Sequence, residues 1–317
     1  MHAADKVVIT TLVENYVDML IPDTDTVKRP GLAYHFDLRN KKILAENGLA
    51  MLVDVYFGGK RHRILLDTGL TDTVILHNMA ALGIAPNEID HVVLSHGHPD
   101  HYGGLLGLLK ARDYPLTVTL HPDAFLIRHV KAGNGMVIPY YNQSLRRDEI
   151  EAAGARLVLA RDPMPVCPAA TTTGEIPFEV DFEPPGPAAG TASSLWCLRE
   201  GRFEEDKTVD DMALIVNVKD KGLLVITGCA HAGVINTIHH ARKITGEQKI
   251  YALFGGFHLG FPGIPADKCT MTVEELKGLN PAVVSPMHCS GFRTLAAVQQ
   301  AMPEAFLLNT AGAQITL

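Results

Sequence analysis

The segment VVLSHGHPDHYGG constrains this chain more than any other stretch of it. It places four potential metal ligands, His96, His98, Asp100 and His101, within six residues, directly after an apolar run. The β-branched residues at the start of this segment are typical of a buried strand. GGLLGLLKARD, which begins with the last two glycines of the segment, has the apolar spacing of a helix. The four side chains are therefore expected in a strand-to-helix loop, where functional groups commonly lie on an α/β scaffold.

Imidazole and carboxylate groups at this spacing can hold metal ions. His96 and His98 alternate at the end of the strand, so both rings point to one side and can share one ion. Asp100 and His101 follow where the chain turns into the helix, and they can serve a second ion. The pattern HxHxDH after a strand therefore favours metal binding over a histidine-rich surface loop.

Strand and helix patterns recur in both the first and the last third of the chain. Residues 49–57 and 62–69 predict a hairpin around two glycines. Residues 211–228 predict two strands around KDKG, and TVEELKGLN predicts a short helix with a capping box formed by Thr272 and Glu275. We therefore predict an α/β fold with two similar halves, packed sheet to sheet with the helices outside.

The middle of the chain, about residues 125–205, is rich in proline and glycine and includes RDPMPVCPAATTTGEIPFEVDFEPPGPAAG. This composition favours loops. The segment is too interrupted to supply a core of its own, so we expect one domain over residues 1–317. In this interpretation the irregular insertions at about 125–205 wall the active site.

The composition limits the class of protein. There are 28 basic and 35 acidic residues, a net charge of −7, which disfavours nucleic acid as a partner. No apolar run is long enough to span a bilayer and no signal peptide is evident, so we expect a soluble cytoplasmic protein without membrane contact. The cysteines are odd in number and form no CxxC, which argues against a disulfide framework. They are Cys167, Cys197, Cys229, Cys269 and Cys289.

Six segments together resemble a known family. SHGHPDHYGG is similar to the HxHxDH signature of the metallo-β-lactamase superfamily, and ILLDTG to an earlier strand end of that superfamily. LAENGLAMLV, VITGCAHAGVINTI, FGGFHLG and PMHCSGF, in this order, resemble a subgroup named after an archaeal dihydropterin-ribofuranosylaminobenzene-phosphate synthase. The matches run over nearly the whole chain apart from its middle. The resemblance implies an αββα sandwich, in which two mixed β-sheets pack face to face with helices outside.

The resemblance also implies a set of site residues. Asp67 in ILLDTG would accept a hydrogen bond from the ring N–H of a ligand histidine, on the nitrogen that does not bind the metal, and so fix the tautomer of that ring. His258 in FGGFHLG would face the substrate, and Asp100 would both ligate and orient a metal-bound hydroxide. The expected metal ligands are His96, His98, Asp100, His101, Cys229, His231 and His288.

Three positions depart from the pattern of the subgroup. Asn47 stands where the subgroup usually has histidine, and Glu175 in TTGEIP is nearest to the place of a third histidine ligand. Cys229 stands where an aspartate often bridges two metals, and it can either bridge as a thiolate or line the pocket. The third histidine ligand and the bridging aspartate of the superfamily are therefore both missing here. His231, two residues after Cys229, is the natural candidate to replace a missing ligand.

These residues imply a metal-dependent hydrolase. We expect two divalent ions, with zinc favoured over manganese or iron, to activate water against a phosphoester or a related ester or lactone of a small molecule. One alternative is a transferase that condenses a dihydropterin diphosphate with a ribofuranosylaminobenzene phosphate. A second alternative is a non-catalytic metal-binding sensor. The sequence leaves the oligomeric state open, a homodimer included.

Overall fold

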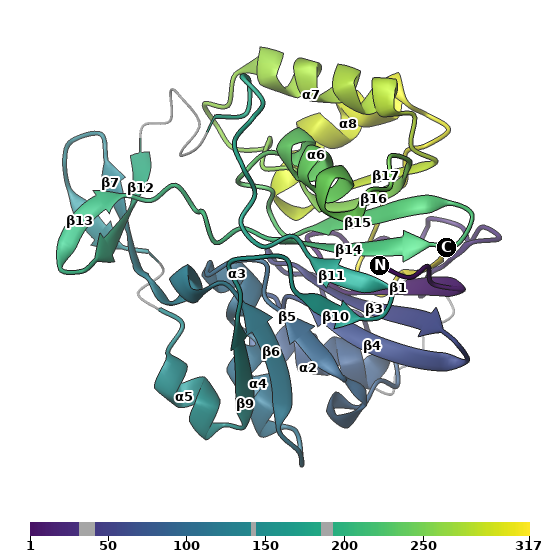
Figure 1. Ribbon diagram of the computed structural model, residues 1–317, viewed down its shortest axis with the longest axis horizontal. Helices are drawn as coiled ribbons and strands as arrows, with labels where there is room; N and C mark the ends of the chain where they lie inside the picture. Colours follow the sequence, from purple (N-terminus) through teal and green to yellow (C-terminus); the bar gives the residue numbers. More distant parts are fainter. Residues whose placement is uncertain (32–41, 141–143, 185–192) are drawn as a thin grey trace.

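Two β-sheets lie face to face at the centre of the molecule, with helices on both outer sides (Figure 1). The computed structural model describes residues 1–31, 42–140, 144–184 and 193–317. Both sheets contain parallel and antiparallel pairs. The predicted arrangement of two mixed sheets with helices outside is therefore confirmed.

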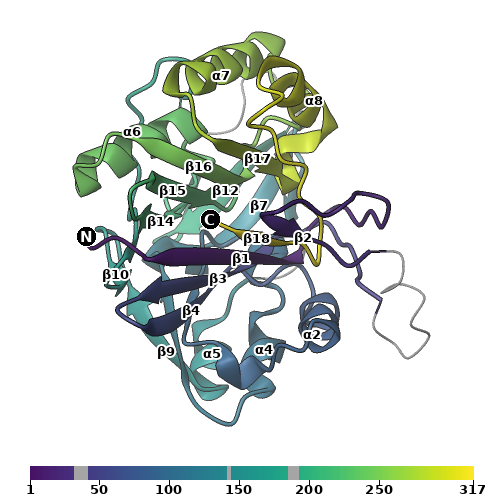
Figure 2. The ribbon, with the colours of Figure 1, turned by 90° about the vertical axis from the view of Figure 1, so that its right-hand side faces the viewer.

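The first sheet has eight strands in the order β2-β18-β1-β3-β4-β5-β6-β9. The C-terminal strand β18 pairs with β1, so strands from the two ends of the chain lie side by side in this sheet (Figure 2). β3 and β4 form the predicted hairpin, with Phe57 opposite Lys60. The strands are β1 (Lys6–Val13), β2 (Val27–Lys28), β3 (Ala50–Phe57), β4 (Lys60–Leu66), β5 (His91–Val93), β6 (Leu116–Leu120), β9 (Ala155–Leu159) and β18 (Gln314–Thr316).

The second sheet has six strands in the order β10-β11-β14-β15-β16-β17. The strands β14 and β15 are the pair predicted around KDKG. β15, β16 and β17 are parallel, so the three loops that follow them leave the sheet at one edge. The strands are β10 (Pro165–Cys167), β11 (Ala170–Thr172), β14 (Ala213–Val218), β15 (Gly222–Thr227), β16 (Ile250–Gly256) and β17 (Val283–Met287).

Three apolar clusters stabilise these layers. The central cluster lies between the sheets and includes Ile9 and Val53 from the first sheet and Phe254 from the second. A second cluster packs α2, α4 and α5 on the first sheet, and a third packs α6, α7 and α8 on the second. The α-helices are α2 (Asp72–Ala81), α3 (Pro99–Tyr102), α4 (Leu105–Lys110), α5 (Arg147–Ala152), α6 (Val234–Thr245), α7 (Ala266–Leu279) and α8 (Gly291–Ala301). The 3₁₀-helices are η1 (Pro86–Glu88), η2 (Pro122–Phe125) and η3 (His288–Ser290). Among the described residues, no helix is long and apolar enough to cross a membrane.

The predicted capping box of Thr272 and Glu275 is wrong. Helix α7 begins at Ala266, directly after Pro265, so Thr272 lies inside the helix. Its hydroxyl donates to the carbonyl of Lys268 four residues earlier, a bond that a threonine within a helix can make. The helix therefore begins about two turns further toward the N-terminus than the sequence indicates.

The loops predicted for residues 125–205 are also wrong in part; residues 141–143 and 185–192 lie outside the described residues. Strands β9, β10 and β11 of this segment belong to the two main sheets. Four others form a separate sheet in the order β13-β12-β7-β8, which lies to one side of the sandwich (Figure 1). They are β7 (Ile127–Ala132), β8 (Val137–Pro139), β12 (Ser193–Arg199) and β13 (Arg202–Glu205). The prolines concentrate between these strands, and a composition taken over the whole segment hides the strands themselves.

We expect Phe254→Ala to lower the free energy of unfolding by about 3–5 kcal/mol, because the ring is fully buried between the two sheets. Chemical denaturation followed by circular dichroism measures this change. Phe203 on the small sheet is the matched control, since its side chain is 47% exposed and its removal should change stability by less than about 0.5 kcal/mol. Equal losses in both variants would contradict the placement of the core.

Candidate metal centre

Three histidines from distant parts of the chain form the first group of ligand atoms. His96 and His98 come from the loop between β5 and α3, and His231 from the loop between β15 and α6. One ring nitrogen of each lies within 4.8 Å of those of the other two. The Nε2 atoms of His96 and His231 are 3.2 Å apart. Three imidazole nitrogens that converge in this way can hold one divalent cation.

A second group lies beside the first and combines a carboxylate with two imidazoles. Asp100 and His101 from α3 meet His288, the first residue of η3 after β17. The Oδ2 atom of Asp100 is 3.3 Å from Nε2 of His288, and all three side chains are buried. The two groups contain six of the seven predicted ligands.

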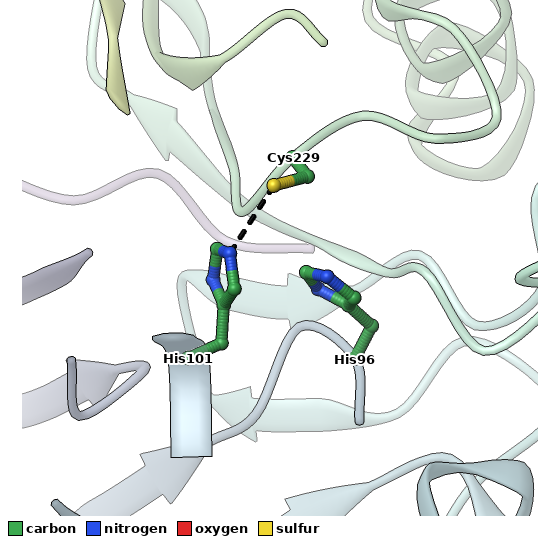
Figure 3. A group of neighbouring side chains, drawn as sticks. All are labelled: His96, His101 and Cys229. Atoms are coloured by element: carbon green, nitrogen blue, oxygen red, sulfur yellow. Dashed lines mark hydrogen bonds between the residues drawn. The ribbon is translucent and has the colours of Figure 1, made fainter. Parts of the chain in front are cut away.

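Cys229 joins the two groups. Its Sγ atom is 3.1 Å from Nε2 of His101 and lies within 4.8 Å of a ring nitrogen of His96 as well (Figure 3). The ring of His101 projects from α3 and that of His96 from the loop before it, whereas the thiol comes from the loop after β15 (Figure 3). Cys229 therefore occupies a position from which one atom can contact two cations.

The donor set fits divalent cations. Nε2 of His98 and Oδ1 of Asp100 are buried and have no hydrogen-bond partner among the described residues. A buried polar atom without a partner is unfavourable by about 1–3 kcal/mol, and a bound cation would supply that partner. The imidazole, carboxylate and thiol groups are the ligand types that zinc accepts most readily.

The electrostatics of the histidines also suit a cation. Burial, followed by the proximity of His101 and the other rings, lowers the pKa of His96 well below its usual value. Burial likewise lowers the pKa of His98 and of His231. Metal ligation needs the neutral imidazole, so all three rings are in the ligating form at neutral pH.

The carboxylate of the second group is ionised. Burial acts to raise the pKa of Asp100, but His101 and His288 outweigh it and hold the pKa below its ordinary value. For His288, burial acts to lower the pKa, but the hydrogen bond to Asp100, together with the nearby Cys289 and Glu14, outweighs it and raises the pKa to about 9. In the absence of a cation, Asp100 and His288 therefore form an ion pair.

Asp67 makes the contact that its predicted role requires. Its Oδ2 atom lies 2.7 Å from Nδ1 of His101, whose Nε2 faces Cys229. The same carboxylate accepts the backbone N–H and the hydroxyl of Ser95, both at 2.7 Å. Because the Ser95 hydroxyl is also 2.9 Å from Nδ1 of His96, Asp67 orients one ring directly and a second ring through Ser95.

A buried ion pair holds the same loop from the other side. Nη2 of Arg128, from β7, donates to Asp210 at 2.7 Å, and its Nε donates to Asp206 at 2.6 Å. The backbone of Gly97, between the two ligand histidines, contacts both partners: its N–H donates to Asp210 at 2.8 Å and its C=O accepts from Arg128 at 3.0 Å. A Cβ atom at Gly97 would lie 2.2 Å from the carbonyl oxygen of Ala124, so only glycine fits there.

His258 lies beside the centre on an unusual backbone. It follows β16 with φ of 50°, and its ring centroid is 4.1 Å from that of His231. The exposed ring of Phe261 lies tilted against that of His258, with 4.5 Å between the ring centroids. The ring centroid of Tyr140, after β8, lies 5.1 Å from that of His98. Aromatic and imidazole side chains therefore lie beside the ligand groups.

Two of the positions that depart from the subgroup pattern lie outside these groups. Glu175 is 43% exposed and pairs with His121 at 2.9 Å and with Arg161 at 2.6 Å. Asn47 is exposed, whereas its neighbour Glu46 accepts hydrogen bonds from the backbone and hydroxyl of Thr71. Neither belongs to a ligand group among the described residues. His231, rather than Glu175, lies with His96 and His98.

Sequence reasoning missed several residues that support the centre. Ser95, Arg128 and Asp210 have been described above, and Asp211 is a fourth. The carboxylate of Asp211 is fully buried, its Oδ1 is 4.0 Å from Nδ1 of His96, and burial raises its pKa well above the usual value. The adjacent aspartates before an apolar strand were a visible signal in the sequence, but nothing in the sequence singled out Arg128.

Comparisons with known proteins agree with this geometry. The family profile described as the metallo-beta-lactamase superfamily matches residues 45–288, which include all the ligand positions named above. This chain belongs to that superfamily. The solved structure of Tm1679, a metal-dependent hydrolase of the beta-lactamase superfamily, superposes with a TM-score of 0.70 at 24% identity and covers 98% of each chain. Zinc-bound PqqB from Methylobacterium extorquens superposes with a TM-score of 0.52 at 16% identity, over 98% of this chain and 99% of PqqB. These two likenesses show the fold.

A curated relative is closer in sequence. The 7,8-dihydropterin-6-methyl-4-(beta-D-ribofuranosyl)-aminobenzene-5'-phosphate synthase of Methanocaldococcus jannaschii is 36% identical over 279 residues. The alignment covers 87% of this chain and 91% of the relative. The metallo-beta-lactamase fold, predicted from the HxHxDH segment and the later motifs, is confirmed.

We expect Asp67→Ala to weaken metal binding by about 10–100-fold, because the variant no longer fixes the ring of His101. Competition with a chromophoric chelator measures the affinity. Asp54→Ala is the matched control, since Asp54 is a buried aspartate that pairs with Arg63 in the first sheet. An unchanged affinity in a folded Asp67→Ala protein would contradict the role of Asp67.

We expect Arg128→Lys to weaken metal binding by about tenfold or more, because an ammonium group cannot contact Gly97, Asp206 and Asp210 together. The same competition assay applies. Arg63→Lys alters another buried arginine, paired with Asp54 and Glu88, and should leave the affinity unchanged. If the two variants lose stability equally and neither loses affinity, the ion pair of Arg128 serves only the fold.

Proposed function

We propose that this protein is a metal-dependent hydrolase whose dinuclear centre activates water against a phosphoester or a related ester of a small molecule. One observation carries the proposal: two ligand groups, one of three imidazoles and one of two imidazoles and a carboxylate, share Cys229 between them. Such adjacent groups suit two cations about 3.5–4 Å apart, the spacing typical of two-metal hydrolytic sites.

A pair of bound cations would lower the pKa of a water between them from about 15.7 toward 7 and would neutralise charge on the substrate. The chain itself supplies the remaining functions. The carboxylate of Asp100 stays ionised at neutral pH, and its Oδ1 has no hydrogen-bond partner among the described residues. Asp100 can therefore accept a hydrogen bond from the attacking water, which directs the lone pair of the water oxygen toward the substrate.

His258 is the proposed catalytic partner on the substrate side. Its Nδ1 atom is buried without a hydrogen-bond partner in the described part of the chain, and its ring is partly exposed beside His231. An imidazole in this position can donate a hydrogen bond to a phosphoryl oxygen or to the leaving group as negative charge develops there. Zinc is the favoured ion because the donor set contains imidazole and thiol groups.

A transferase is the second candidate, and one observation favours it. The relative with 36% identity over most of both chains is named a synthase of a ribofuranosyl-aminobenzene phosphate. Transfer that releases diphosphate would use the same features of this centre: cations to bind phosphoryl oxygens, and Asp100 and His258 to manage protons. The two candidates differ in whether water or a second organic substrate attacks.

We expect the zinc-loaded protein to hydrolyse p-nitrophenyl phosphodiesters or lactones, with activity lost after removal of metal by a chelator and regained on its return. His98→Ala and His288→Ala should lose metal content and activity together, because each removes one ligand from a different group. His239→Ala is the control, since His239 is an exposed residue of α6.

Three results would contradict this proposal. Product formed only when a pterin diphosphate and an aromatic amine are both supplied would establish the transferase instead. Full metal content in His98→Ala and in His288→Ala would mean that the ligand groups are misassigned. Bound metal without turnover of either substrate set would leave a metal-binding sensor.

A further inference from the structure

A second thiol lies against Cys229. The Sγ atom of Cys289, in η3, is 3.6 Å from the backbone carbonyl oxygen of Cys229. The Sγ atoms of Cys229 and Cys289 and a ring nitrogen of His288 all lie within 4.8 Å of one another. Both cysteines are buried and neither is in a disulfide. Two thiols and an imidazole thus converge on the side of the centre that includes His288.

The backbone leaves space for this second sulfur. Gly256 ends β16, and a Cβ atom there would lie 2.4 Å from Sγ of Cys289 and 3.2 Å from Cα of Cys229. No side chain could occupy that position without displacing the sulfur of Cys289. The motifs GCAH, GGFH and MHCSG, which follow three parallel strands, therefore meet at the pair of sulfur atoms.

The distances suit a metal site. Two ligands of a tetrahedral zinc ion, with bonds of about 2.0–2.3 Å, lie roughly 3.3–3.8 Å apart. Ligand atoms within 4.8 Å of one another can reach this spacing through small side-chain rotations. If Cys229 and Cys289 only filled space in the core, alanine or valine could take their positions. Two thiols beside an imidazole instead form a soft donor set that discriminates among metals.

We propose that Cys289 joins Cys229 and His288 as a ligand, which makes this position selective for a soft cation such as Zn²⁺ or Cd²⁺ over Mn²⁺. On binding, each thiol and the protonated ring of His288 release one proton to solvent, and the freed lone pairs of the two sulfurs and the ring nitrogen form the bonds to the cation. The inference rests on the proposed metal centre and adds one ligand and a metal preference to it. Hard cations such as Mn²⁺ prefer oxygen ligands, whereas the ligand atoms grouped at this position are two sulfurs and a ring nitrogen.

Cobalt provides a spectroscopic test, because a Co²⁺–thiolate bond gives a charge-transfer absorption in the near ultraviolet that Co²⁺ bound by nitrogen and oxygen lacks. The wild-type protein and the variants Cys229→Ser and Cys289→Ser are each loaded with Co²⁺, and their cobalt contents are measured and matched. The matched control is Cys269→Ser, which changes a buried cysteine of α7 whose thiol contacts Thr294. A second measurement is the ratio of Zn²⁺ to Mn²⁺ bound after dialysis against an equimolar mixture.

We expect the charge-transfer band in wild type and in Cys269→Ser, and a reduced band in both Cys229→Ser and Cys289→Ser. We also expect Cys289→Ser to lower the bound ratio of Zn²⁺ to Mn²⁺ by about tenfold or more. A full band and an unchanged ratio in folded Cys289→Ser would overturn the proposal and leave Cys289 as a packing residue. Because the band is independent of turnover, a band that is reduced in Cys289→Ser, in a protein that hydrolyses nothing, would reject the hydrolase and retain Cys289 as a ligand.

Discussion

The carboxylate of Asp67 is the interaction on which the rest of the centre depends. It lies at the end of β4 with φ of 59°, an unfavourable conformation for a residue other than glycine. In this conformation the carboxylate accepts two hydrogen bonds from Ser95, at the end of the neighbouring strand, and contacts the ring of His101. One buried group thus joins two strand ends to the helix that carries half of the HxHxDH segment.

The second sheet is built directly against this group. A Cβ atom at Gly228 would lie 3.0 Å from Oδ2 of Asp67 and 2.0 Å from the hydroxyl of Ser95. The absent side chain therefore lets the loop after β15 approach closely enough to bring Cys229 and His231 to the histidines of the first sheet. The backbone N–H of Met212 donates to the carbonyl of Ser95 at 2.8 Å and fixes the two sheets at the same point.

The parts of this arrangement that could be predicted are local. Period and turn residues identify β3, β4, β14 and β15, and the spacing of His96, His98, Asp100 and His101 within one loop indicates a metal site. His231 and His288 are 135 and 192 residues beyond His96, and only the resemblance to a family connected them to it. Arg128 could not be found in this way, because its importance comes from Asp206 and Asp210, about 80 residues later. Glu175 failed as a candidate for a related reason: its position along the chain suggested a ligand, but the fold pairs it with Arg161 instead.

The balance of charge links the two candidate functions. With neutral imidazoles, the carboxylate of Asp100 and one thiolate at Cys229 contribute two negative charges, whereas two divalent cations contribute four positive charges. The proposed centre would then carry a net charge of about +2, or about +1 if Cys289 also binds as a thiolate, within a chain whose overall charge is −7. A buried positive centre would attract an anionic group at that point. A phosphoester and a diphosphate both meet this requirement, so the centre constrains the reacting group more tightly than it constrains the nucleophile.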